Sequence, residues 1–125
     1  MKYLAMVVDD DAASRFIYER VLKSLDFNVL QAGDGATAIE LLSSHTPQIL
    51  LLDLLLPRIS GLQVLEYARK APHLRNLQIV VITAHSEFPE THTLGHNEQF
   101  LLKPVMARTL RELIARAMQS ASNTS

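Results

Sequence analysis

Four groups of polar residues in this sequence combine chemical types that act on phosphate and metal ions, and each group follows a short apolar run. The groups are Asp9–Asp11, Asp53, Thr83 and Lys103. Carboxylate oxygens bind hard divalent cations, whereas a hydroxyl and an ammonium donate hydrogen bonds to an anion such as a phosphoryl group. If the fold brings these residues together, they predict a site where a metal ion and a phosphoryl group meet.

Asp53 is the most informative of these residues because it is the single charge in the apolar run Ile49–Leu56. A buried carboxylate without partners costs several kcal/mol, so Asp53 needs a cation or hydrogen-bond donors beside it. An aspartate that only caps the turn after a strand is the alternative. Asp53 by itself leaves both interpretations open.

The acidic run Asp9–Asp11 also has an ordinary interpretation, as a solvated turn or as the N-cap of the following helix. Its meaning changes if the strand before it is the neighbour of the strand before Asp53. Asp9, Asp10 and Asp53 would then crowd one pocket, with only the Lys103 ammonium to balance them. Mg²⁺ fits such a pocket, because it prefers oxygen ligands and shares its shell with water and phosphate oxygens.

The elements that must position these residues are visible as five short apolar runs separated by segments of helical period. Continuously apolar runs are typical of strands buried on both faces, and strands alternating with helices predict a parallel sheet with helices on both sides. Ligands bind such sheets beyond the carboxyl ends of the strands, where the strand order reverses. The expected strands are Tyr3–Val8, Asn28–Gln31, Ile49–Leu52, Ile79–Thr83 and Phe100–Leu102.

Apolar residues at helical spacing mark the faces with which four helices should pack against the sheet. The intervening segment 84–98 is weaker because Pro89 and Gly95 interrupt it, so we expect a short or distorted fourth helix there. The expected packing faces are Phe16, Ile17, Val21 and Leu25; Ala38, Ile39 and Leu42; Val64, Leu65 and Ala68; and Leu110, Leu113, Ile114 and Ala117.

Length and composition narrow the class of protein further. A chain of 125 residues, 48% of them hydrophobic, fits one domain over 1–119, followed by a polar tail or the start of a linker at 120–125. A net charge of −1 argues against direct nucleic-acid binding, and the absence of cysteine excludes disulfides and cysteine-based nucleophiles or metal sites. No apolar run is long enough to span a membrane and no cleavable signal pattern is visible, so we expect a cytoplasmic domain without membrane contact.

Taken in order, these motifs resemble the signature blocks of response-regulator receiver domains. The similarity runs over nearly the whole chain, and it implies a doubly wound five-stranded parallel sheet of order 2-1-3-4-5, a flavodoxin-like three-layer α/β sandwich. The matching blocks are Val7–Asp11, Asp53–Pro57 with Gly61, Thr83–Ala84 and Lys103–Pro104.

The resemblance also implies roles at the metal and phosphoryl sites. Asp53 would be the phosphoacceptor, taking a phosphoryl group from a phosphohistidine on a sensor histidine kinase or a histidine phosphotransfer protein. Asp10 would bind Mg²⁺ directly and Asp9 directly or through water. Asp53 and the backbone carbonyl of Leu55 would be further ligands. Lys103 would pair with Asp53 and with the phosphoryl group.

The resemblance further implies a conformational switch. Thr83 would turn inward to hydrogen-bond a phosphoryl oxygen, and Phe100, at the aromatic switch position, would rotate inward as Thr83 moves. The Lys103–Pro104 peptide would be cis. Near the acceptor, the apolar side chain of Leu55 cannot orient an attacking water, whereas His85 could. We therefore predict slow hydrolysis of the phosphoryl group.

Departures from the family pattern leave the output open. Asn97–Glu98 stands where small residues usually precede the last strand, and the span from Thr83 to Lys103 is short, so the fourth helix is in doubt. Because that helix usually carries the output, neither the downstream effector nor a homodimer follows from the resemblance. His92 and His96 at helical spacing could bind a metal, but a solvated polar loop is favoured. We expect a signalling switch rather than an enzyme, with a phosphorylation-independent receiver-like binding module as the alternative.

Overall fold

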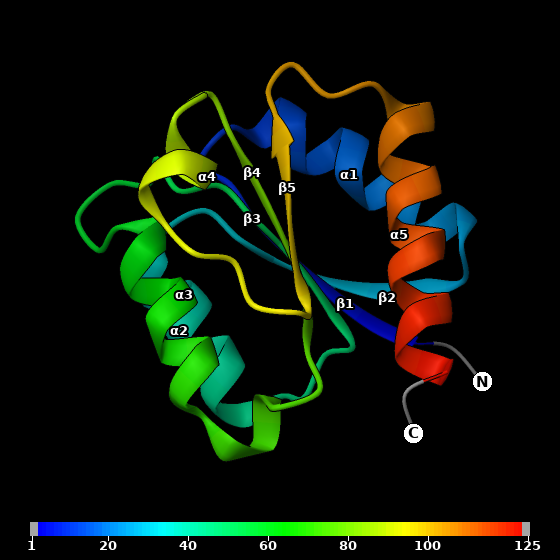
Figure 1. Cartoon of the computed structure of the whole chain (residues 1–125), viewed down its shortest axis with the longest axis horizontal. Coiled ribbons are helices and arrows are strands. Elements are labelled where there is room, and N and C mark those ends of the chain that lie inside the picture. The colour runs from blue at the N-terminus through cyan, green and yellow to red at the C-terminus, as the bar shows by residue number, and fades with distance from the viewer. Residues whose placement is uncertain (1–2, 124–125) are drawn as a thin grey trace.

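A computed structural model describes residues 3–123 as a five-stranded parallel sheet between two layers of helices (Figure 1). The strand order is β2-β1-β3-β4-β5, as the sequence predicts. The strands are β1 (Tyr3–Val8), β2 (Phe27–Ala32), β3 (Ile49–Leu52), β4 (Gln78–Thr83) and β5 (Glu98–Leu102). The helices are α1 (Ala12–Ser24), α2 (Gly35–Ser44), α3 (Gly61–Lys70), α4 (Phe88–Thr91) and α5 (Ala107–Asn123), with a 3₁₀ turn, η1, at Pro72–Leu74.

Each face of the sheet has its own apolar core, because successive strand residues point to opposite faces. In β1, Met6 and Val8 pack on the side of α2 and α3, whereas Ala5 and Val7 pack on the side of α1 and α5. All four of these side chains are buried. The continuously apolar runs in the sequence therefore reflect burial on both faces of a parallel sheet.

The strand order reverses at β1, which pairs with β2 on one side and with β3 on the other. The next residue on each of these strands is an acidic one, Asp9 after β1 and Asp53 after β3. A reversal of this kind opens a crevice at the carboxyl ends of the central strands. The topology therefore brings the acidic groups of two distant segments to one edge of the sheet.

The packing face of α1 differs from the predicted one. Phe16 and Ile17 are 57% and 47% exposed, whereas Tyr18, Val21 and Leu22 are buried against the sheet. Val21 belongs to two apolar stripes on α1, and we predicted that the stripe beginning at Phe16 is the buried one. The sheet covers the other stripe, which contains a tyrosine whose apolar ring packs like a core residue.

The fourth helix is a single turn, in line with the short or distorted helix predicted from Pro89 and Gly95. Pro89 lies in its first turn, where the missing N–H would have no helical partner, and α4 ends at Thr91. His92 and His96 therefore do not share a helix face. At the other end of the chain, α5 continues to Asn123, into the segment predicted as a tail. Residues 124–125 lie outside the described part. No helix within residues 3–123 is both long and apolar enough to cross a membrane.

A partly buried ion pair holds the chain where α4 stops. Arg69 in α3 donates from Nε to Glu98 Oε2 at 2.8 Å and from Nη2 to Glu98 Oε1 at 2.6 Å. Nη2 also donates to the carbonyl of Thr93 at 3.1 Å, and Glu98 Oε1 accepts from the backbone N–H of Gly95 at 3.0 Å. The pair therefore ties the irregular segment after α4, and the first residue of β5, to α3.

Replacing Glu98 by glutamine should lower the free energy of unfolding at neutral pH by about 1–3 kcal/mol, because it weakens charge-assisted hydrogen bonds. The Arg69 guanidinium holds the pKa of Glu98 below its ordinary value of 4.5. The ion pair therefore contributes fully above that value, and its contribution is lost as the pH falls through the folded-state pKa. Urea unfolding from neutral to acid pH should show the wild type and Glu98→Gln converging only below the ordinary value.

The matched control is Glu90→Gln, which removes the same charge from an exposed position in α4. We expect it to change the free energy of unfolding by less than about 0.5 kcal/mol at any of these pH values. A Glu98→Gln protein as stable as the wild type at neutral pH would contradict the assignment of this ion pair as the anchor of β5.

Candidate functional site

Three of the predicted site residues, Asp9, Asp53 and Lys103, lie one residue beyond the ends of β1, β3 and β5, where the sheet's hydrogen bonds continue. The backbone N–H of Asp53 donates to the carbonyl of Val8 at 2.9 Å. The backbone N–H of Lys103 donates to the carbonyl of Thr83, also at 2.9 Å. These bonds extend the β1–β3 and β4–β5 pairings by one residue, so the positions of Asp53 and Lys103 are set by the sheet itself.

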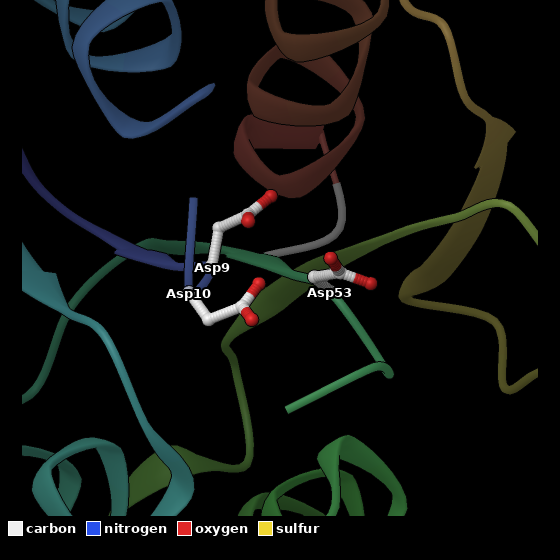
Figure 2. A group of neighbouring side chains, drawn as sticks. All are labelled: Asp9, Asp10 and Asp53. Atoms are coloured by element: carbon white, nitrogen blue, oxygen red, sulfur yellow. The ribbon is translucent and has the colours of Figure 1, made fainter. Parts of the chain in front are cut away.

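Three carboxylates gather at this edge (Figure 2). One oxygen from each of Asp9, Asp10 and Asp53 lies within 4.8 Å of the others. Asp9 and Asp53 are only 1% and 4% exposed, whereas Asp10 is exposed to solvent. Like charges this close repel one another strongly at low dielectric. A positive charge beside the three carboxylates offsets this repulsion.

Lys103 supplies that charge inside the protein. Its Nζ donates to Asp9 Oδ2 at 2.8 Å and to Asp53 Oδ2 at 2.9 Å. Burial alone would lower the pKa of the Lys103 ammonium, but these hydrogen bonds outweigh burial and hold the pKa above its ordinary value. Burial raises the pKa of Asp9, and the bond from Lys103 offsets this only in part. The ammonium is thus the shared partner of two carboxylates that are costly to bury alone.

The acidic run after β1 divides into a helix cap and two site residues. Asp11 caps α1, because its carboxylate accepts hydrogen bonds from the backbone N–H of Ser14 at 3.3 Å and from the Ser14 hydroxyl at 2.7 Å. The remaining oxygen of Asp9, Oδ1, accepts from the backbone N–H of Asp11 at 2.9 Å. The run therefore contains both a helix cap, Asp11, and two carboxylates that lie close to Asp53.

The loop after β3 is folded against the predicted acceptor. The backbone N–H of Leu55 donates to Asp53 Oδ1 at 3.0 Å, so Leu55 stays close to the carboxylate. A Cβ at Gly61 would run into the backbone of Leu54 and Asp53, which makes glycine necessary where α3 begins. Ser60 forms a capping box with Gln63. The loop and the helix start are thus fixed together around the acceptor.

The donor chemistry of this edge fits Mg²⁺. The oxygens are hard ligands, two of the carboxylates are buried and oriented by hydrogen bonds, and the third faces solvent. Mg²⁺ is usually held by one or two carboxylates while it keeps several waters or phosphate oxygens. Asp10 and Asp53, with Asp9 beside them, could hold such an ion at the mouth of the crevice.

Thr83 and Phe100, the predicted switch residues, occupy different surroundings. Thr83 is fully buried, and its hydroxyl accepts from the backbone N–H of His85 at 3.4 Å. The half-buried ring of Phe100 stacks on Phe88 of α4, with ring centroids 5.9 Å apart, and Phe88 stacks on His92 at 4.7 Å. The Lys103–Pro104 peptide is cis, as predicted.

Two features of this region lie beyond what the sequence reasoning found. Phe88 is buried and joins α4 to Phe100, and Glu98 is buried through its pairing with Arg69. A lone aromatic residue next to Pro89 would have been the only local signal for the first. No local pattern relates Arg69 to Glu98, because their contact depends on how α3 lies relative to the start of β5.

Known proteins resemble this chain in sequence and in fold. The family model of the response regulator receiver domain matches residues 5–115. The regulatory protein LuxO of Vibrio vulnificus (strain YJ016) is 35% identical over 118 residues, which cover 93% of this chain and 26% of LuxO. The chain thus spans about a quarter of the length of the LuxO relatives.

Solved structures agree with this relationship. The REC domain of AraT, a response regulator from Geobacillus stearothermophilus, is 30% identical with a TM-score of 0.84, covering 99% of this chain and 98% of that one. The receiver domain of the sensor histidine kinase PA1611 from Pseudomonas aeruginosa PAO1 has a TM-score of 0.83 at 23% identity, covering 95% and 99% of the two chains. That structure has a magnesium ion coordinated in its active site cleft. Because the family model matches residues 5–115, this chain belongs to the response regulator receiver domain family.

Proposed function

We propose that this domain is a phosphoacceptor switch that receives a phosphoryl group on Asp53 and signals by changing conformation. The donor would be a phosphohistidine on a sensor histidine kinase or a histidine phosphotransfer protein. The observation that carries the proposal is the Lys103 ammonium, held 2.9 Å from Asp53 and 2.8 Å from Asp9 at the reversal of strand order. This arrangement supports the proposal because the cation lies beside a carboxylate and a group of oxygens whose donor chemistry fits Mg²⁺.

The proposed transfer step uses one oxygen of Asp53 as the nucleophile. A bond forms between this oxygen and phosphorus while the phosphorus–nitrogen bond of the phosphohistidine breaks, and the imidazole keeps the electron pair and takes up a proton. Mg²⁺, held by Asp10 and Asp53 with Asp9 and the Leu55 carbonyl, would supply positive charge opposite the phosphoryl oxygens. Lys103 stabilises charge on the phosphoryl group from the side of β5.

The proposed switch follows from competition for the same donors. Lys103 now divides its hydrogen bonds between two carboxylates, and Thr83 now accepts from the His85 backbone. A phosphoryl group on Asp53 gives both side chains a doubly charged partner, so conformations in which they close on it gain population. The stack of Phe100 on Phe88 would carry this change to α4.

The proposed function also covers the class of the domain, its partners and its location. The product of the transfer is the phosphorylated domain itself, so we class it as a switch rather than an enzyme. Its partners would be the phosphodonor protein and a downstream effector, either a separate protein or a further part of a longer chain. A cytoplasmic location belongs to this proposal, and a homodimer remains open.

Labelling with a small acyl phosphate or phosphoramidate in the presence of Mg²⁺ should add one phosphoryl group, read by intact mass. Asp53→Asn should abolish the gain because it removes the nucleophile, and chelation of Mg²⁺ should reduce it strongly. Asp34→Asn is the matched control, since it removes the same charge at the N-cap of α2, away from the strand ends, and keeps a capping residue. This control should be labelled like the wild type.

A folded wild type that takes up no phosphoryl group with Mg²⁺ present would contradict the proposal. It would favour the alternative, a receiver-like module that binds partners without phosphorylation. The single-turn α4 is the observation that supports this alternative, because it departs most from the family pattern. Labelling that persists in Asp53→Asn would instead move the acceptor to another residue.

Leu55 should make the phosphorylated state long-lived. Its side chain is 50% exposed and lines a hollow of about 250 Å³, together with His85. A polar side chain there could orient a water for attack on phosphorus, and Leu55→Asn should therefore speed dephosphorylation about tenfold, which corresponds to about 1.4 kcal/mol of barrier. His85→Ala should slow it. Loss of the phosphoryl mass over time measures both.

The control for this series is Met106→Asn, which places the same amide at an exposed apolar position after β5. Its dephosphorylation rate should match that of the wild type. An unchanged rate in Leu55→Asn would show that this position does not set the lifetime, while leaving the acceptor assignment intact.

A further inference from the structure

Arg15 reaches the predicted metal site from α1. Its Nη1 donates to the backbone carbonyl of Asp9 at 2.7 Å. The backbone N–H of Asp9 donates to the carbonyl of Ala32 at 3.1 Å, which is the last bond of the β1–β2 ladder. Asp9 is therefore held by β2 on one side of its backbone and by α1 on the other.

The guanidinium of Arg15 is itself held in one orientation. Its Nε donates to Gln31 Oε1 at 3.1 Å, and Gln31 Nε2 donates to Glu19 Oε2 at 2.8 Å. Two hydrogen bonds from one planar group fix the direction of that plane. Gly33 leaves the space for it, because a Cβ at that position would lie 3.2 Å from Nη1.

The peptide that Arg15 holds is the one that leads into Asp10. The carbonyl of Asp9 and the nitrogen of Asp10 belong to one planar unit, so a fixed carbonyl also fixes where the Asp10 backbone starts. The Asp9 carboxylate has its own anchors in Lys103 and the Asp11 N–H. Asp10 is exposed, and its oxygen must still stay within 4.8 Å of those of Asp9 and Asp53.

We propose that Arg15 is a positioning residue of the metal site, and that its bond to the Asp9 carbonyl directs the Asp10 carboxylate toward the bound divalent cation. The inference rests on the proposed function, since it takes Mg²⁺ as the cation. Arg15 does not touch the ion in this arrangement. It acts through the backbone, and Gln31 supports it from β2.

Positioning and simple electrostatics predict opposite effects, which makes the proposal sharp. Arg15 is a positive charge close to a site for a positive ion, so Coulomb repulsion alone would make Mg²⁺ bind more tightly once Arg15 is removed. Loss of positioning makes Mg²⁺ bind more weakly, because the Asp10 carboxylate then has more conformations to lose on binding. The sign of the change therefore separates the two.

The experiment is a calorimetric titration of the whole chain with MgCl₂, at constant ionic strength, with thermal unfolding followed in parallel. We expect Arg15→Ala to raise the dissociation constant about tenfold or more, as loss of outer partners does at metal sites. Gln31→Leu, which changes no charge, should raise it less. Gln31→Leu should have no further effect in the Arg15→Ala background, because both act through one bond.

The matched control is Arg20→Ala, which removes the same charge from an exposed position on α1, where Arg20 lies over the ring of Phe16. It should leave the dissociation constant unchanged or slightly lower. If Arg15→Ala does not fold, Arg15→Lys provides the measurement. Lysine keeps the charge but lacks the fork that binds Asp9 and Gln31 together, so it should bind Mg²⁺ more weakly than the wild type.

An unchanged or lower dissociation constant in a folded Arg15→Ala or Arg15→Lys protein overturns the positioning role and leaves the proposed function standing. A wild type that binds no Mg²⁺ overturns both the positioning role and the metal requirement of the proposed function. Weaker binding in Arg15→Ala and Gln31→Leu, with unchanged binding in Arg20→Ala, supports the positioning role.

Discussion

The charge balance around the Lys103 ammonium is the interaction on which the rest of the site depends. Two buried carboxylates, Asp9 and Asp53, share this one cation at 2.8 and 2.9 Å. Burying either carboxylate without a partner would cost several kcal/mol. The three residues come from three different strand ends, so the pairing exists only because the sheet places β1, β3 and β5 in their observed order. The electrostatic balance of the site therefore depends directly on the order of the strands in the sheet.

The same balance explains how the site can respond to a ligand. Each buried carboxylate is held by a backbone N–H and by Lys103, so its geometry is set by the protein itself. Because Asp9 and Asp53 share the Lys103 donor, an anion of larger charge beside Lys103 would draw its hydrogen bonds away from them. Asp10 is the exposed member of the group, and its direction depends on the backbone that Arg15 holds.

The region around α4 depends both on local sequence effects and on contacts between distant elements. Pro89 limits α4 to one turn, which is a local effect of the sequence. The chain after this turn is then held by Arg69 and Glu98, which lie in different elements. Stacking of Phe100 on Phe88 joins the short helix to β5. In the proposed switch, the stack of Phe100 on Phe88 is the contact that would carry a change from the site toward α4.

The elements, and the edge at which the acidic residues gather, could be predicted from the order of the residues alone. Apolar runs such as Ile49–Leu52 and the irregular segment around Pro89 are local properties, so strand positions and the short fourth helix could be predicted from them. Packing between distant elements, by contrast, determines which of two stripes on α1 is buried, leaving Phe16 and Ile17 exposed. It also determines that Arg69 pairs with Glu98. These outcomes depend on where elements cross in space, and a chain's local pattern carries no information about crossings between distant segments.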